Sequence, residues 1–252
     1  MADMTGVWAK FRRAEHHAQA FERLLAGFLE SDSYAVAVEF DAETGWHHFR
    51  WSVMKEPPRE EFAVLFGDML YNLRASLDYL VWQLVLANGE VPDRGNSFPA
   101  AKSPKAWAAA QGNDLRGVHP VWIAEIDKLQ PYKRVDRPEV HMLAILDYVN
   151  NLNKHRVLPI TLADAETWEA LFDVRSVPDG EQIEHFFDPT MKHAADLFRI
   201  RCASKVKLNV KMNPKPPIRV SFSDGLNYDW VNADLVHWVF HALARFEPAF
   251  PS

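Results

Sequence analysis

EEFAVLFGDMLYNLRASLDYLVWQLVLANG, residues 60 to 89, is the stretch that decides the fold of this chain. Apolar residues recur along it at the spacing of one helix face, and Asn88-Gly89 ends it with residues that suit a left-handed helix cap. The pattern therefore predicts a long central helix. Its apolar face consists of Phe62, Phe66, Met69, Leu73, Leu77, Leu80 and Leu84.

The opposite side of this helix also carries large aromatic residues, Tyr71, Tyr79 and Trp82. A helix that is wet on one side rarely places three aromatic residues there. We therefore expect the helix to be packed on both faces, with its polar residues drawn into partly buried positions. Those polar residues are Asp68, Asn72, Arg74 and Asp78.

The rest of the chain changes from a helical period to a period of two. Residues 5–30 follow a helical pattern with Thr5 as the expected N-cap, and two alternating runs around a turn at 41–45 predict a β-hairpin over 34–53. Further helices are expected at 103–111, 121–129, 139–155, 191–200 and 229–246. Further strands are expected at 157–162, 171–177, 183–187 and 205–212, the last turning into 218–222 as a second hairpin.

Helices and strands are segregated rather than alternating as β-α-β units, so the predicted fold class is α+β. The helical core is expected on residues 59–88 and 139–155, with antiparallel β-hairpins and a C-terminal helix covering it. We predict a single domain over residues 1–252. It consists of a mainly helical part at 1–156, a β-rich part at 157–228 and a C-terminal helix at 229–247.

Composition limits the function only broadly. The chain is 48% apolar and 12% aromatic, which is enough for a sizeable core, and its net charge of -6 gives no global attraction for nucleic acid. One cysteine, Cys202, excludes an internal disulfide framework and a multi-thiolate metal site. Because no signal segment or membrane-spanning stretch is visible, we expect a cytoplasmic protein that does not contact a membrane.

Five short motifs follow one another in a fixed order between residues 67 and 156: Gly67-Asp68, the run from Asn72 to Asp78, Phe98-Pro99, the run from Leu129 to Tyr132, and the run from Asn153 to Arg156. This order resembles a group of uncharacterised bacterial proteins that read HNLRSALDHLV, FP, LQPY and DKHR. The resemblance covers roughly residues 60 to 160 and implies no established activity.

Arg74 carries a second resemblance, to HEPN domains, which are helical folds often found in RNases and toxins. Their catalytic motif is an Arg followed a few residues later by a His. The resemblance implies that Arg74 is the catalytic Arg, while Tyr79 stands at the position of the His. Tyr71 likewise stands where the first group usually shows a His.

Two helices carry polar residues that are expected to converge. Asp147, Asn151 and His155 are spaced i, i+4 and i+8 on one helix stripe, and Arg74 and Asp78 form an i, i+4 pair on the central helix. Such a set is a candidate catalytic site, in which the carboxylate orients an imidazole for acid/base chemistry. It is equally a candidate for a buried polar network that fixes the helix register. Both interpretations stay open.

The last predicted helix contains Asp234, His237 and His241. Two His residues four apart share a helix face and can bind zinc together with a carboxylate. The apolar residues of this helix point the other way and no fourth ligand is evident, so we predict no metal and keep these three residues only as candidates. No P-loop, G-x-G-x-x-G or G-x-S-x-G motif is present, so no cofactor is predicted.

Residues 192–219 contain eight basic side chains and one acidic one. Lys205, Lys207 and Lys211 share one face of a predicted strand, and together with Arg219 they form a candidate site for RNA or another polyanion. The alternative is a solvated sheet face, or an edge that Lys protects against aggregation.

Three hypotheses for the function remain. The first is a binding or regulatory module, monomeric or homo-oligomeric, with a buried polar network at its helical core. The second is a HEPN-like, RNA-directed RNase or defence-type protein that uses Arg74 and His155. The third is a metal-dependent hydrolase at Asp234, His237 and His241. The sequence leaves open whether the chain is an enzyme.

Overall fold

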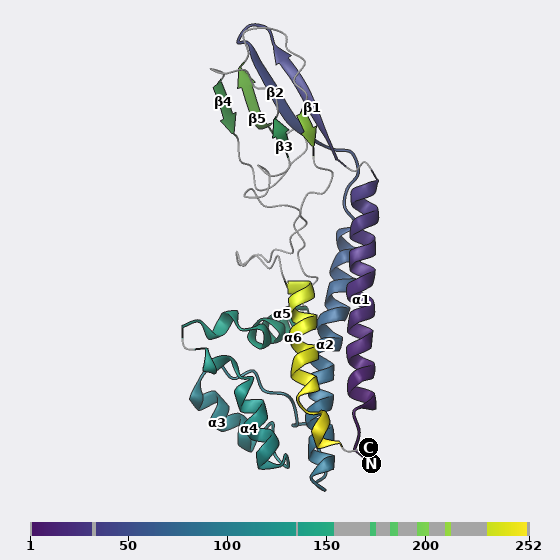
Figure 1. Cartoon of the computed structure of the whole chain (residues 1–252), viewed down its shortest axis with the longest axis vertical. Coiled ribbons are helices and arrows are strands. Elements are labelled where there is room, and N and C mark those ends of the chain that lie inside the picture. Colours follow the sequence, from purple (N-terminus) through teal and green to yellow (C-terminus); the bar gives the residue numbers. More distant parts are fainter. Residues whose placement is uncertain are drawn as a thin grey trace. The chain divides into compact units, whose positions relative to one another are not determined.

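The structure, a computed structural model, describes residues 2–31, 34–134, 136–153, 172–174, 182–185, 196–201, 210–212 and 231–250. It has the α+β fold predicted from the sequence (Figure 1). The helices are α1 (Thr5–Glu30), α2 (Arg59–Ala87), α3 (Pro104–Gly112), α4 (Pro120–Lys128), α5 (Met142–Asn153) and α6 (Val231–Ala244). The strands are β1 (Tyr34–Asp41), β2 (Trp46–Val53), β3 (Phe172–Val174), β4 (Gln182–His185), β5 (Asp196–Arg201) and β6 (Val210–Met212).

The chain divides into two compact units. The first consists of residues 1–21, 60–158 and 230–252, and the second of residues 22–59 and 159–229. The first unit therefore holds α3 to α6 and all but the first residue of α2, whereas the strands all belong to the second. The hairpin over residues 34–53, which the sequence prediction placed with the helical part, groups with the later strands.

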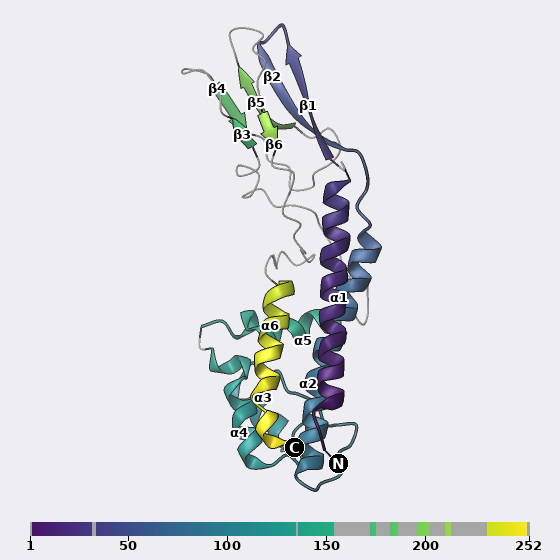
Figure 2. The same ribbon diagram turned by 45° about the vertical axis from the view of Figure 1, so that its right-hand side comes forward.

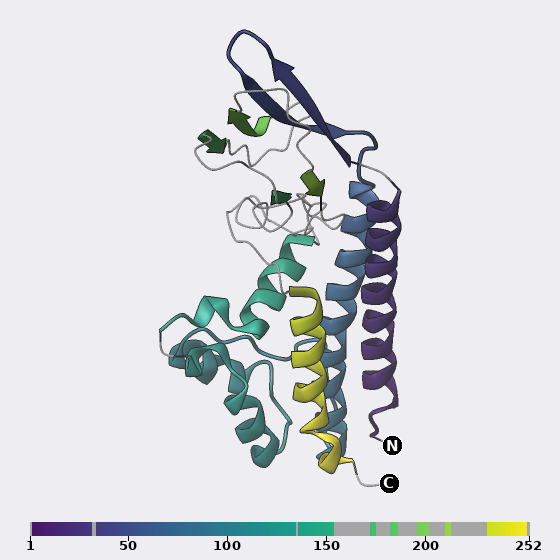
Figure 3. The same ribbon diagram turned by 45° about the horizontal axis from the view of Figure 1, so that its top comes forward.

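The core of the first unit forms along α2. The predicted apolar face of this helix is confirmed, because its seven residues are at most 1% exposed. Helix α1 runs antiparallel to α2: the Phe21 ring lies 5.1 Å from that of Phe62, and at the other end the Asp3 N–H donates to Gln83. Figures 1 and 3 show α1 and α6 beside α2, and the Trp8 ring of α1 lies 5.6 Å from Phe240 of α6.

The end of α2 is a Schellman cap, as Asn88-Gly89 predicted. Gly89 has a φ of 77°, the left-handed conformation that glycine adopts without a steric penalty. The N–H of Gly89 donates to the Leu86 carbonyl at 3.0 Å, and the N–H of Glu90 donates to the Val85 carbonyl at 3.2 Å. The chain can therefore leave the helix with its last carbonyls satisfied.

The expectation that α2 is packed on both faces is wrong. Tyr71, Tyr79 and Trp82 are 52%, 46% and 41% exposed, and the side chain of Asp68 is 53% exposed. Helix α1 covers only the flank of these aromatic residues, where the Lys10 ammonium lies 5.7 Å from the ring centroids of both Tyr71 and Tyr79. Of the four polar residues expected to be drawn inward, Asn72, Arg74 and Asp78 are partly or fully buried.

The helix starts differ in detail from the predictions. Asp3, and not Thr5, caps α1, because the Asp3 carboxylate accepts the Thr5 N–H at 2.8 Å. A 3₁₀ turn at Pro138–Val140 precedes α5, which begins only at Met142. The His141 ring accepts the Leu143 N–H at 3.2 Å and so satisfies one of the free donors at this helix start. Of the described helices, none is long and apolar enough to cross a membrane.

The second unit contains an antiparallel four-stranded sheet in the order β1-β2-β5-β4 and a two-stranded sheet of β3 and β6 (Figure 2). The predicted hairpin is confirmed as β1 and β2. The predicted strands at 171–177 and 205–212 contain β3 and β6, and the one predicted at 183–187 overlaps β4, which begins at Gln182. The predicted strands at 157–162 and 218–222 lie outside the described residues. Of the second predicted hairpin, which joins 205–212 to 218–222, the structure therefore describes only β6.

The predicted helix at 191–200 is wrong for its described part, since residues 196–201 form β5. Phe198 and Ile200 alternate with Arg199 and Arg201, and this alternation matches the sheet. Ile200 is fully buried, whereas the Arg199 guanidinium lies 4.3 Å from the Trp46 ring centroid and pairs with Glu184 of β4. Pairing between neighbouring strands thus overrides the local helical pattern.

Substitutions of two glycines test the cap of α2 and the interior of α1. Gly89→Ala should lower the free energy of unfolding by about 1 kcal/mol, because alanine is strained at a positive φ. Gly27 lies in the interior of α1, and a Cβ atom added there would meet nothing within 4 Å, so Gly27→Ala should raise the free energy by about 0.5 to 1 kcal/mol. Urea unfolding of both variants measures this difference, and equal effects would contradict it.

Candidate functional site

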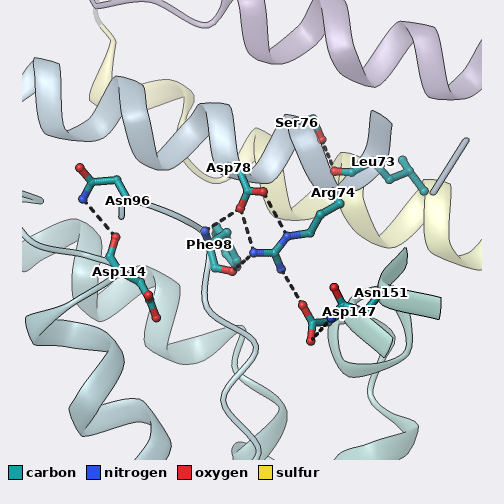
Figure 4. A network of polar contacts seen from close by, with 9 residues as sticks. All are labelled: Leu73, Arg74, Ser76, Asp78, Asn96, Phe98, Asp114, Asp147 and Asn151. Atoms are coloured by element: carbon teal, nitrogen blue, oxygen red, sulfur yellow. Dashed lines mark hydrogen bonds and ion pairs between the residues drawn. The ribbon is translucent and has the colours of Figure 1, made fainter. Parts of the chain in front are cut away.

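The centre of the candidate site is the guanidinium of Arg74 on α2. Its side chain is only 13% exposed, and it donates to three acceptors (Figure 4). Nε and one NH2 group bond the two carboxylate oxygens of Asp78 at 3.2 and 2.8 Å. The same NH2 group donates to the Phe98 carbonyl at 2.5 Å, and the other reaches Asp147 of α5 at 3.4 Å. Arg74 therefore joins α2, the loop at Phe98 and α5.

Asp78 and Arg74 together hold the backbone of Phe98. Asp78 lies one helix turn after Arg74, so both side chains lie on the same side of α2. While Arg74 donates to the Phe98 carbonyl, Asp78 accepts the Phe98 N–H at 2.9 Å. The Phe98 side chain is fully buried. A loop residue in the core is thereby left with both backbone polar groups paired, as burial requires.

Helix α5 supplies the remaining members of the network. Asp147 contacts Arg74, and the Asn151 amide lies 3.5 Å from the other Asp147 oxygen. The predicted convergence is confirmed for Arg74, Asp78, Asp147 and Asn151. His155, the proposed imidazole of the catalytic interpretation, lies outside the described residues. The described part of the site thus contains carboxylates and a guanidinium, in ion-paired contact with one another.

Asp114, after the end of α3, was not predicted to belong to this site. Burial raises the pKa of its carboxyl above the ordinary value, and the nearby Asp78 carboxylate acts in the same direction, whereas Arg74 opposes the shift. The Asp114 carbonyl accepts hydrogen bonds from the Ser97 N–H and the Asn96 amide, both at 3.2 Å. No sequence spacing signals this residue, because a loop contact alone brings it to the network.

The motifs that carry the fingerprint resemblance are points where segments join. Gln130 is fully buried, accepts the Ala101 N–H at 2.9 Å and donates to the Ile126 carbonyl at 3.2 Å. The Tyr132 N–H donates to the Ala101 carbonyl at 3.0 Å. A side chain at Gly67 would overlap Asn153, so the end of α5 approaches α2 at this glycine. Gly67, Gln130 and Tyr132, three of the described residues of these motifs, therefore have structural roles in this chain.

Family models, curated proteins and solved structures give no match to this chain. The resemblances to the fingerprint group and to HEPN domains accordingly stay predictions. The function is therefore inferred from the geometry of the described residues.

The two positions of the HEPN-like motif contact different parts of the first unit. Arg74 is bonded to Asp78, Phe98 and Asp147. Tyr79 is about half exposed and lies beside α1, within 5.7 Å of Lys10. Five residues at about 100° per residue separate the two side chains by roughly 140° around α2. A joint action of these two residues on one substrate is therefore not supported by their placement.

The candidate metal residues lie on the exposed side of α6. The rings of His237 and His241 are packed edge to face with centroids 4.2 Å apart, and Asp234 is exposed one turn earlier. Within the described ranges, no three His, Cys, Asp or Glu side chains are grouped so that they could hold a metal ion. The hydrolase hypothesis thus gains no support from this part of the chain.

Most of the candidate polyanion site cannot be placed. Lys205, Lys207 and Arg219 lie outside the described residues, and Lys211 lies in β6, where its partner in register is Asp173 of β3. Arg199, from the same basic segment, pairs with Glu184. An acidic residue thus stands opposite each of these two basic residues, and the polyanion site stays a prediction.

Removing the guanidinium tests the importance of the network for folding. Arg74→Ala should lower the free energy of unfolding by about 2 to 4 kcal/mol, because Asp78 and the Phe98 carbonyl lose a charged partner. Arg74→Lys should recover only part of this loss, since an ammonium cannot donate in the same forked geometry.

Arg137→Ala is the matched control for denaturant unfolding of these variants. Arg137 and Glu139 form an ion pair in which the side chains are 65% and 58% exposed, so its loss should cost less than about 1 kcal/mol. Equal losses for Arg74→Ala and Arg137→Ala would contradict a central role for Arg74.

The raised pKa of the Asp114 carboxyl predicts that stability depends on pH. Because the pKa of its carboxyl is raised in the folded state, the ionised form is disfavoured there, and this penalty is relieved as the pH falls through the raised pKa towards 3.8. Asp114→Asn should therefore be more stable than the wild type at neutral pH, and its advantage should shrink on acidification. Urea unfolding over a pH series measures the difference, and a difference independent of pH would contradict the assignment.

Proposed function

We propose that this chain is a non-catalytic binding module, in which the Arg74 network is the scaffold and the uncovered face of α2 is the binding surface. The observation that carries the proposal is the contrast between these two regions of one helix. Arg74 and Asp78 are paired with each other inside the unit, whereas Tyr71, Tyr79 and Trp82 are 41 to 52% exposed on the outward face.

The hydrogen bonds that Arg74 forms within the protein support a scaffold role. A guanidinium has five N–H donors. The guanidinium of Arg74 forms four hydrogen bonds within the protein, two to Asp78, one to Asp147 and one to the Phe98 carbonyl. An arginine that binds phosphate or stabilises a transition state needs its fork directed at the substrate. Arg74 would first have to leave its protein partners.

The outward face of α2 supports a binding role. It presents large apolar side chains, which we call the α2 aromatic stripe: Val64, Tyr71, Tyr79, Trp82 and Leu86. These residues make up half of the ten large apolar residues exposed in the described part of the chain, so the exposed apolar surface is concentrated on this helix. Contiguous patches of this kind mark interaction sites, and Tyr and Trp are enriched in protein interfaces.

An RNA cleavage assay separates this proposal from the RNA-directed alternative. We expect the purified wild-type chain to show no cleavage of single-stranded RNA that depends on Arg74, while Arg74→Ala lowers the melting temperature. The proposal would be overturned by the opposite pair of results, namely cleavage by the wild type that Arg74→Ala abolishes at an unchanged melting temperature. The melting temperature is the control that separates a lost catalyst from a lost fold.

A further inference from the structure

Four of the five residues of the α2 aromatic stripe form symmetric pairs about Ala75, while the fifth, Trp82, has Asp68 as its counterpart. Val64 and Leu86 lie eleven residues on either side of it, and Tyr71 and Tyr79 lie four residues on either side. At about 100° per residue, the stripe and Ala75 fall within roughly 80° of one another around the helix. One face therefore carries aliphatic residues at its ends, tyrosines nearer the middle and a small residue at the centre, with Asp68 and Trp82 between the ends and the tyrosines.

From this symmetry we infer that the stripe binds the same stripe of a second copy of this chain, with the two α2 helices antiparallel and Ala75 at the two-fold axis. The inference rests on the proposed function and names its partner. In a two-fold interface, residue i contacts residue j and j contacts i. Tyr71 of one copy then faces Tyr79 of the other, and Val64 faces Leu86.

The small residue at the centre suits a close approach of the two helices. Helices pack with their axes about 8 to 10 Å apart, and the lower end of this range needs small side chains at the crossing. Ala75 supplies one from each copy and is itself partly exposed. The tyrosines on either side would then pack as aromatic pairs, which contribute about 0.5 to 1.5 kcal/mol beyond their buried area.

The charges beside the stripe are compatible with this register. Asp68 lies seven residues before Ala75, so it faces Trp82 of the other copy rather than a second carboxylate. Lys10 lies beside the centre of the stripe, and the two Lys10 ammonium groups repel each other across the axis. Each ammonium is within 5.7 Å of two tyrosine rings, and attraction to these aromatic faces offsets the repulsion.

The size of the surface is sufficient for a specific dimer. The stripe extends over 23 residues, from Val64 to Leu86, or about 33 Å of helix, and α1 beside α2 widens the face to about 20 Å. The face therefore offers about 660 Å² per copy, or roughly 1,300 Å² for the pair. Specific interfaces begin at about 1,200 Å², so we expect a dimer whose population depends on concentration.

The mass in solution is the first test. The wild-type chain should sediment at micromolar concentrations with twice its mass of 28.9 kDa. Ala75→Arg places a long side chain from each copy where the two helices approach most closely and adds two charges to those of the Lys10 pair, so it should give a monomer with an unchanged melting temperature. Val121→Arg is the matched control, because Val121 is 57% exposed on α4, away from the stripe, and this variant should remain dimeric.

Cysteine cross-linking tests the register without disrupting the interface. Two Cα atoms that face each other across helices about 8 to 10 Å apart are roughly 3 to 5 Å from one another, which overlaps the range of about 4.4 to 6.8 Å for disulfides. In a Cys202→Ser background, Ala75→Cys should therefore form an intermolecular disulfide efficiently. Tyr71→Cys should cross-link with Tyr79→Cys in a mixture more than either does with itself.

Three outcomes would overturn the inference: a wild-type monomer, a dimer that survives Ala75→Arg, or Tyr71→Cys and Tyr79→Cys variants that link mainly to themselves. A wild-type monomer without RNA cleavage would leave the proposed function intact and assign the stripe to a different partner. Cleavage of RNA that depends on Arg74 would instead defeat the proposed function, whatever the mass in solution.

Discussion

The first unit depends on the ion pair between Arg74 and Asp78. Both residues of this pair also form hydrogen bonds with the backbone of Phe98. A partly buried guanidinium is tolerated only when its donors are matched by acceptors. Here the acceptors come from α2 itself, from a loop and from α5. Satisfying one charge therefore fixes the positions of three segments that are distant in sequence. Gln130 extends the same arrangement by holding the next part of the loop at Ala101.

Helix α2 combines a buried apolar face with an ion-paired flank and an exposed face that carries aromatic residues. Its ionic network faces inward while Tyr71, Tyr79 and Trp82 face outward. An inward charged pair gives a helix a defined register but adds little net stability, so the apolar residues of the other face carry the packing. Within a single copy, the outward aromatic face is contacted by α1 only at its flank, through Lys10. The proposed binding is assigned to this face because it leaves large aromatic side chains exposed.

Periodicity predicted the helices, the first hairpin and the polar pairs, because each depends on residues close in sequence. Arg74, Asp78, Asp147 and Asn151 were found from their i, i+4 spacing. Asp114 and the Phe98 backbone were missed because only loop contacts bring them to Arg74. The helix predicted at 191–200 failed over β5, where pairing with β2 and β4 decides the conformation. The aromatic residues of α2 were recognised, but a single sequence does not distinguish burial within one chain from burial against a partner.

The energetics of Arg74 also argue against an enzyme built on this residue. To bind a phosphate, the guanidinium would have to release Asp78 and the Phe98 carbonyl, and so lose three charge-assisted hydrogen bonds. A new charged hydrogen bond returns only about 1.5 to 3 kcal/mol. The exchange is therefore unfavourable unless a substrate supplies several further contacts. The outward face of α2 has no such barrier, because its side chains already contact solvent and can bind without breaking an interaction inside the unit.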